Sequence, residues 1–120
     1  MAFGGHHYAL IEEPPVPWHV AQDLCASQGG HLVRIQSLEE YEFVKTLAAH
    51  SQLPEFWVDV NDEASEGVWV DADGEPLAYL PWAPGEPNGL GEEGAVILGQ
   101  GDFVDIRCGH RAAFICEWDR

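Results

Sequence analysis

The segment from Asp71 to Gly94 limits the possible folds of this chain more than any other stretch. It is rich in Gly, Pro, Asp and Glu and lies between stretches with the patterns of short strands. Irregular loops of this length are uncommon in compact domains and usually carry a function. Because 120 residues suffice for one domain with its own core but hardly for two, we predict a single domain over residues 1–120.

Two helices are predicted ahead of this loop. Pro17 suits the first turn of a helix, where its missing N–H costs nothing, and Gly29–Gly30 ends that helix. Ser37 to Glu40 forms a capping box that begins the second helix. The predicted apolar faces are Val20, Ala21, Leu24 and Cys25 in the first helix, and Leu38, Tyr41, Val44, Leu47 and Ala48 in the second.

Short strands account for most of the remaining chain. The expected strands are 7–11, ended by residues 12–15, and then 56–60, 68–70, 95–98, 103–106 and 113–118. Two early helices followed by several strands indicate an α+β fold, with the helices packed on an antiparallel sheet.

Acidic residues greatly outnumber basic ones. The chain has 21 Asp and Glu against five Lys and Arg, a net charge of −16. This balance repels phosphate backbones and anionic lipids, and no stretch has the length and apolarity of a membrane span. We therefore expect no nucleic-acid partner and no membrane insertion. A solubilising surface and a cation site both fit the composition, so the positions of the acids must distinguish them.

The long loop contains a candidate cation site. Glu86 and Asn88 flank Pro87, and a cis Glu86–Pro87 bond would turn both side chains toward one point. Either Glu92 or Glu93, with Glu93 preferred, and Asp105 would add oxygens, and Ca²⁺ takes about six to eight. The predicted calcium ligands are Glu86, Asn88, Glu93 and Asp105. The alternative is an ordinary surface turn, because Pro and Asn are common turn residues.

Six motifs, in order along the chain, resemble those of C-type lectin-like domains. They are Cys25–Leu32, Trp57–Val60, Gly67–Val70, the W-A-P-G-E-P-N string of Trp82–Asn88, Phe103–Asp105 and Phe114–Glu117. The resemblance runs from about His7 to Trp118. It implies the short form of that fold, in which two helices pack on antiparallel sheets beside a long irregular ligand-binding loop. It also implies a Cys25–Cys116 disulfide, and it leaves Cys108 without the cysteine that normally completes a second bridge.

The resemblance implies a function as well as a fold. In C-type lectins, vicinal sugar hydroxyls bind the calcium ion, and the order Glu-Pro-Asn accompanies mannose-type ligands. The expected function is calcium-dependent carbohydrate binding, with Glu86, Asn88 and Glu93 also contacting the sugar. An auxiliary calcium site would use Asp62 and Glu66.

One departure from the family pattern keeps a second function open. Val104 stands where the W-N-D motif has asparagine, which removes one oxygen and one amide donor from the site. A calcium-independent protein-interaction domain of the same fold is therefore the alternative, so the partner is either a mannose-type glycan or a protein.

No sequence pattern favours catalysis. The six histidines show no metal-ligand spacing such as H-E-x-x-H, so we predict a binding module that is not an enzyme. The expected location of the domain is extracellular, at the cell surface or periplasmic.

Overall fold

A computed structural model describes residues 2–65, 67–77, 79–86, 93–98 and 102–119, with the backbone alone for residues 2 and 93–98. The described residues form α1 (Trp18–Ser27) and α2 (Leu38–Ala49). The strands are β1 (Ala2–Phe3), β2 (His6–Val16), β3 (His31–Leu32), β4 (Glu55–Asn61), β5 (Glu93–Leu98), β6 (Phe103–Arg107) and β7 (Ala112–Trp118). No helix in this part of the chain is long and apolar enough to cross a membrane.

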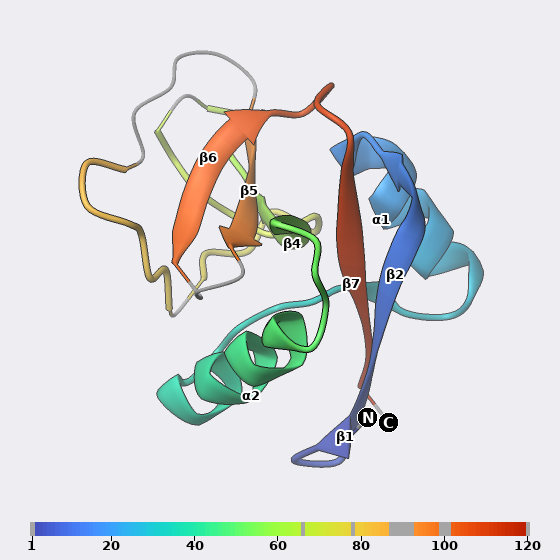
Figure 1. Cartoon of the computed structure of the whole chain (residues 1–120). Coiled ribbons are helices and arrows are strands. Elements are labelled where there is room, and N and C mark those ends of the chain that lie inside the picture. The colour runs from blue at the N-terminus through green and yellow to red at the C-terminus, as the bar shows by residue number, and fades with distance from the viewer. Residues whose placement is uncertain (1, 66, 78, 87–92, 99–101, 120) are drawn as a thin grey trace.

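The strands form one sheet in the order β1-β2-β7-β4-β5-β6, with β3 also paired to β7. Pairing is antiparallel except between β4 and β7, where Phe56 and Trp57 run parallel to Ala113 and Phe114. Figure 1 shows that α1 lies beside β2 and β7, whereas α2 lies below β4 and β5, and that β2 and β7 run side by side. The predicted α+β fold with two helices is confirmed.

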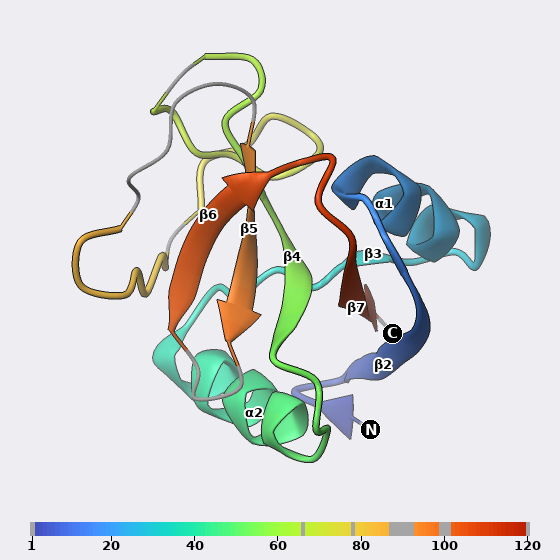
Figure 2. The ribbon, with the colours of Figure 1, turned by 45° about the horizontal axis from the view of Figure 1, so that its top comes forward.

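Alternate residues of the central strands supply two packed clusters, one on each side of the sheet. Phe56 belongs to the cluster that also contains Phe103 and the buried face of α2. Trp57 belongs to the other cluster, which surrounds α1 and the disulfide. Both aromatic rings are fully buried. The turned view in Figure 2 shows β4 between the β5–β6 pair and β7, so β4 connects the two halves of the sheet.

Each helix begins where the sequence predicts. Pro17 precedes α1, and the Ser37 side chain accepts a hydrogen bond from the Glu40 amide at the start of α2. The predicted apolar face of α1 is partly wrong, because Val20 and Leu24 are 42% and 43% exposed. The buried face comprises Trp18, Ala21 and Cys25. The disulfide from Cys25 and the hydrogen bond from Trp18 Nε1 to the Val58 carbonyl at 3.0 Å determine the rotation of the helix.

In α2, the predicted stripe is correct apart from its first residue. Leu38 is 54% exposed, whereas Glu40 is buried. Glu40 tolerates burial because its carboxylate accepts hydrogen bonds from the Tyr8 hydroxyl at 2.7 Å and the Gln36 amide at 2.9 Å.

Two strand predictions are also corrected. Residues 12–15 do not end the first strand, since β2 continues to Val16. Pro14 and Pro15 lie where the register with β7 shifts, so their missing N–H groups interrupt no regular ladder. The predicted strand 68–70 is reduced to isolated bridges from Val70 to Asn61 and Pro76. Because β4 ends at Asn61, residues 68–70 have no continuing strand with which to form a hydrogen-bond ladder.

The pairing of the chain ends should make stability depend on pH. His6 Nδ1 lies 2.6 Å from a carboxylate oxygen of Glu117, and this hydrogen bond is the main cause of the raised His6 pKa. A raised pKa means that the folded state holds the proton more tightly. The resulting stability is present below pH 6.5 and is lost as the pH rises through the raised pKa. The melting temperature should therefore decrease as the pH rises above 6.5. The variant His6→Gln should show a smaller decrease over the same pH range. His50→Gln, at an exposed position, serves as the control and should leave the fall unchanged.

Candidate functional site

The backbone between Pro81 and Glu86 places the first predicted ligand beside β6. Phe103 N donates to the Pro81 carbonyl at 2.9 Å, and Ala83 N donates to the Phe103 carbonyl at 2.8 Å. The Trp82 ring packs edge-on against Trp69 and Phe103, with ring centroids 4.9 and 6.2 Å away. The W-A-P motif therefore acts as an anchor that fixes the start of the Glu-Pro-Asn loop to the end of the sheet.

A tight turn then brings Glu86 inward. Glu86 N donates to the Ala83 carbonyl at 2.9 Å, and Gly85 has φ +84°. Proline followed by glycine at positive φ is the pattern of a type II turn, in which a side chain at the glycine position would be strained. Pro84 and Gly85 of the motif are thus explained by local backbone geometry.

Glu86 and Asp105 come together at this turn. Asp105 is 9% exposed on β6, and Oε1 of Glu86 is shielded from solvent. The pKa of Glu86 is raised, first by a hydrogen bond with the Asp105 side chain and then by burial and the Asp105 charge. Two neighbouring carboxyl groups at a half-buried position do not both ionise readily unless a cation joins them. The arrangement is therefore suited to binding a cation.

The other predicted calcium ligands are described less completely. Asn88 and the proposed cis bond at Pro87 lie outside the described residues, as does Glu92. Glu93 begins β5 opposite Arg107, with its backbone alone described. The structure thus brings together two of the four predicted ligands, Glu86 and Asp105, and leaves the positions of the other two as predictions.

Val104 points away from the carboxyl pair. Its side chain packs against the cluster around Trp57, together with Ile106. Alternate residues of a strand face opposite sides, so Val104 is on the other side of β6 from Asp105. Its role in the described structure is packing.

The predicted auxiliary site is only partly described. Asp62 is 1% exposed, and its Oδ2 accepts a hydrogen bond from the Gly67 amide at 3.1 Å. This contact closes the loop that follows β4. Glu66, the second predicted auxiliary ligand, lies outside the described residues.

Sequence reasoning missed the ionic network that holds the beginning of the long segment. Arg34 Nε donates to Asp59 Oδ2 at 2.6 Å, while Asp59 Oδ1 accepts from the Ala72 amide at 2.9 Å. Arg34 also reaches Asp73 at 3.1 Å and lies 3.7 Å from Asp71. Asp59 is fully buried. A buried aspartate in an otherwise apolar strand requires a partner for its charge. The position of Asp59 in the sequence could therefore have predicted a nearby basic residue.

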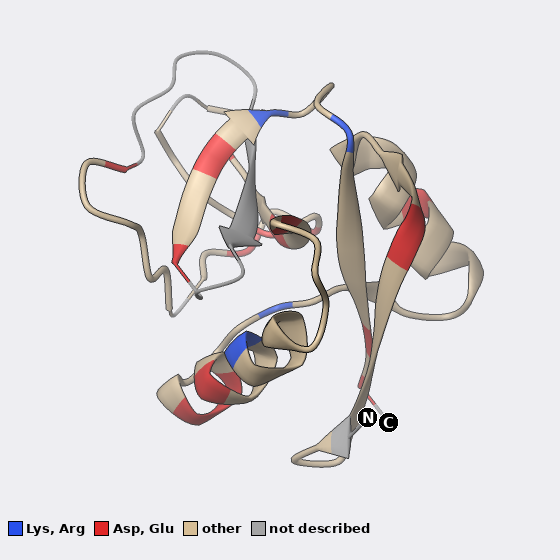
Figure 3. Cartoon of the chain, viewed as in Figure 1, with Lys and Arg blue, Asp and Glu red and all other residues tan. Residues whose placement is uncertain are grey.

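Acidic residues are not confined to the long loop. Figure 3 shows them on α2, β2 and β6 as well, whereas Lys and Arg are few. The net charge alone therefore does not identify the site, and the pairing of Glu86 with Asp105 is the specific observation.

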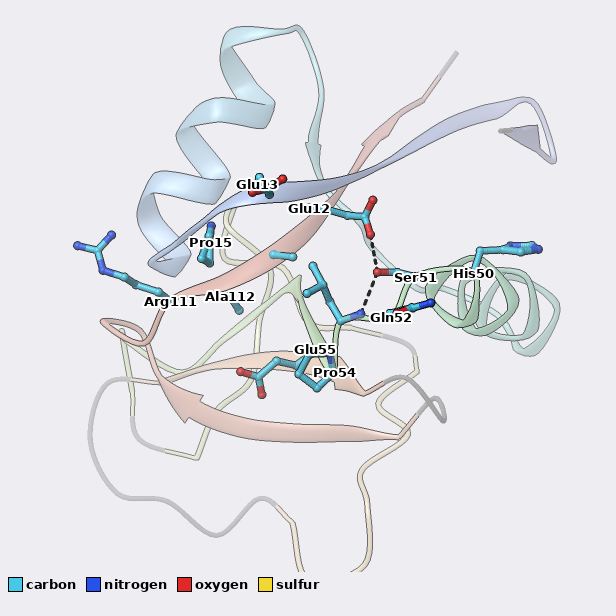
Figure 4. A pocket seen from close by; sticks show the side chains of 12 residues that line it. Glu12, Glu13, Pro15, His50, Ser51, Gln52, Pro54, Glu55, Arg111 and Ala112 are labelled. Carbon is cyan, nitrogen blue, oxygen red and sulfur yellow. Dashed lines mark hydrogen bonds between the residues drawn. The ribbon is translucent and has the colours of Figure 1, made fainter.

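A separate hollow of about 580 Å³ lies between β2, the segment after α2 and the start of β7. Figure 4 shows Glu12 and Ser51 on its wall, with the Ser51 hydroxyl donating to Glu12 at 2.6 Å. Arg111 lines its other side, and neither Glu86 nor Asp105 contributes to it. This hollow is distinct from the carboxyl pair.

Comparison with known proteins identifies the family. The Lectin C-type domain family model matches residues 15–118, and the chain belongs to this family. It is 35% identical over 101 residues to human "C-type lectin domain family 17, member A", a match covering 83% of this chain and 26% of that protein. The chain thus spans about a quarter of the length of that relative.

Solved structures agree with this assignment. The mouse scavenger receptor C-type lectin carbohydrate-recognition domain superposes with a TM-score of 0.89 at 28% identity, covering 100% of this chain and 95% of that one. The cow CD23 carbohydrate-recognition domain, solved in the presence of a GlcNAc2Man3 oligosaccharide, gives 0.86 at 32% identity, with coverages of 98% and 90%. The described structure also contains the Cys25–Cys116 disulfide that the resemblance implies.

Proposed function

We propose that this chain is a calcium-dependent carbohydrate-binding module with a preference for mannose-type sugars, acting as one domain in an extracellular, cell-surface or periplasmic protein. The observation that supports it best is the apposition of Glu86 and Asp105 at the Glu-Pro-Asn loop. Asn88 and Glu93 complete the proposed calcium site. A divalent ion there relieves the repulsion between the carboxylates and keeps positions open for ligand oxygens.

Sugar recognition follows from this open coordination. Two vicinal hydroxyls replace solvent on the ion, and each can donate to a Glu oxygen and accept from an amide N–H. Glu86, Asn88 and Glu93 are the proposed sugar contacts. The oligosaccharide named with the cow CD23 structure contains mannose, which supports this class of ligand. Catalysis has no part in the proposal.

Calcium should stabilise the folded chain. Calcium at 100 times its dissociation constant is expected to raise the free energy of unfolding by about 2.7 kcal/mol. Glu86→Gln should remove most of this gain, because an amide replaces the carboxylate that neutralises the ion. Glu75→Gln is the matched control, since Glu75 is exposed in the same long segment. Thermal unfolding with and without calcium measures both. A wild-type protein that calcium does not stabilise would refute the calcium site.

Sugar binding requires its own measurement. Mannose titrated by calorimetry should bind in millimolar calcium and lose binding when a chelator is added. Galactose, whose hydroxyls have a different arrangement, should bind more weakly. Absence of mannose binding under both conditions would end the carbohydrate proposal even if calcium binds.

One observation favours a second function. Val104 stands where C-type lectins have an asparagine, and it packs against the cluster around Trp57 on the face of β6 opposite Asp105. This position therefore offers no amide to a sugar at the carboxyl pair. A sugar hydroxyl that would pair with that amide loses a partner, which costs about 1–3 kcal/mol if the hydroxyl is buried. This is comparable with the whole of a millimolar affinity, which is about 4 kcal/mol. The second candidate is therefore calcium-independent protein binding through the long loop. Chelator-insensitive capture of a protein partner, unaffected by Glu86→Ala, would select it.

A further inference from the structure

Three potential metal ligands from distant parts of the sequence meet on the side of the sheet that carries α1. They are a ring nitrogen of His19 in α1, a carboxylate oxygen of Glu63 after β4, and Sγ of Cys108 after β6, all within 4.8 Å of one another. His19 and Glu63 already approach to 2.6 Å. We propose that His19, Glu63 and Cys108 bind a zinc-class divalent transition metal, at a site separate from the calcium site.

The three side chains come from positioned backbone. Trp18 N donates to the Cys108 carbonyl at 3.0 Å, which ties the start of α1 to the end of β6. Glu63 N donates to Asn61 Oδ1 at 3.1 Å, which fixes the chain just after β4. The Trp18 ring stands perpendicular to the His19 ring with centroids 5.2 Å apart. Metal binding therefore requires side-chain adjustment rather than folding of a loop.

The three ligand atoms lie within 4.8 Å of one another, so binding a tetrahedral ion requires side-chain movements on the order of 1 Å. With Zn–S near 2.3 Å and Zn–N or Zn–O near 2.1 Å, tetrahedral ligands are about 3.4–3.6 Å apart. His19 Nε2 and Glu63 Oε2 are 2.6 Å apart. Their separation must therefore increase by about 0.8 Å to reach tetrahedral spacing. The His19 side chain is 60% exposed, so it can rotate outward as the ion replaces the hydrogen bond.

The donor set selects the metal. Nitrogen, sulfur and one carboxylate oxygen suit Zn²⁺, whereas Ca²⁺ prefers an all-oxygen shell. Binding deprotonates Cys108, whose proton passes to solvent as the S–metal bond forms. The thiolate and carboxylate then balance the 2+ charge of the ion. This neutrality matters because Cys108 is 8% exposed and a net charge there would be costly.

The fourth coordination position faces solvent. His19 and Glu63 line an open hollow of about 550 Å³ that also contacts Trp18 and Gly74. Three protein ligands with one open position is an arrangement that zinc commonly takes. Water or an exchangeable ligand from this hollow completes the shell.

Cobalt provides a direct test on the full chain with its disulfide intact. Co²⁺ titration should produce one thiolate-to-metal charge-transfer band per chain, and Zn²⁺ should displace it, while millimolar Ca²⁺ should not. Cys108→Ser should abolish the band. His19→Gln should weaken Co²⁺ binding at least about tenfold, since loss of even an outer-shell partner typically costs that much. Because His19 is exposed, this variant keeps the test valid if Cys108→Ser fails to fold.

A second histidine–carboxylate group supplies the control. His6, Glu117 and Asp119 also bring their ligand atoms together, but this group has no sulfur. His6→Gln should leave the cobalt band unchanged, and so should Glu86→Gln, which removes calcium stabilisation only. A wild-type chain without the band, or a band retained in Cys108→Ser, would overturn the proposal.

Discussion

Arg34→Ala is expected to lower the free energy of unfolding by about 3–5 kcal/mol, because it leaves the fully buried Asp59 without its cation. Arg34 Nε is 2.6 Å from Asp59 Oδ2, and the arginine side chain is itself only 19% exposed. Removing one partner of a buried pair costs more than the pair contributes, since the remaining charge loses both water and its counter-ion. Urea unfolding at neutral pH measures the loss.

The effect of Arg34→Ala should depend on pH. Burial raises the pKa of Asp59 above its usual value even though Arg34 and the Ala72 amide act in the opposite direction. Without Arg34 this pKa rises further, so the folded state binds the proton more tightly than the unfolded chain. That contribution is present at low pH and lost as the pH rises through the folded-state pKa. The difference between variant and wild type should therefore be largest at neutral pH and shrink on acidification.

Two variants make this result specific. Arg111→Ala removes an arginine from an exposed position and should change stability by less than about 0.5 kcal/mol. Arg34→Lys retains a charge but loses the planar guanidinium that reaches both Asp59 and Asp73, so its loss should be intermediate. If Arg34→Ala is as stable as Arg111→Ala, Asp59 does not depend on Arg34.

This network also concerns the binding loop. Asp59 accepts from the Ala72 amide, and Asp71 accepts from the Asp73 and Glu75 amides at 2.9 and 3.1 Å. These contacts hold the first turn of the long segment against β4. Loosening them should weaken calcium binding as well as stability, because the ligands would lose part of their preorganisation.

Removal of the disulfide should have the largest effect on stability. Cys25 and Cys116 are 91 residues apart in the sequence, and a loop of that length contributes about 4–5 kcal/mol in the chain-entropy account. Cys25→Ala/Cys116→Ala should lose about that amount, a large part of the 5–15 kcal/mol typical of a domain. Chemical unfolding compared with the wild type measures it.

The remaining cysteine is the control for this experiment. Cys108→Ala removes a thiol but opens no disulfide, so its cost should be clearly smaller than that of the double variant. A double variant that unfolds within about 1 kcal/mol of the wild type would contradict the expectation, and would mean that the packing of α1 on β7 holds the two ends of the chain together without the covalent bond.

The sequence was most informative where structure depends on near neighbours. Ser37 and Glu40 are three residues apart and cap α2 as the motif predicts. Pro17 likewise stands directly before α1. The errors arise where a distant contact determines orientation. Val20 and Leu24 have helical spacing, yet they are exposed because Trp18 and Cys25 are held by Val58 and Cys116.

Taken by itself, the sequence determined the fold class and the family resemblance, because both depend on ordered local motifs. The resemblance in turn implied the Cys25–Cys116 pair. The tertiary structure alone decided which charges meet. Arg34 forms an ion pair with Asp59, which is 25 positions away in the sequence. Cys108 lies near His19 and Glu63 only because α1 and the ends of β4 and β6 are neighbours in the fold. Side chains far apart in sequence become neighbours through strand order and helix rotation, which local patterns do not encode.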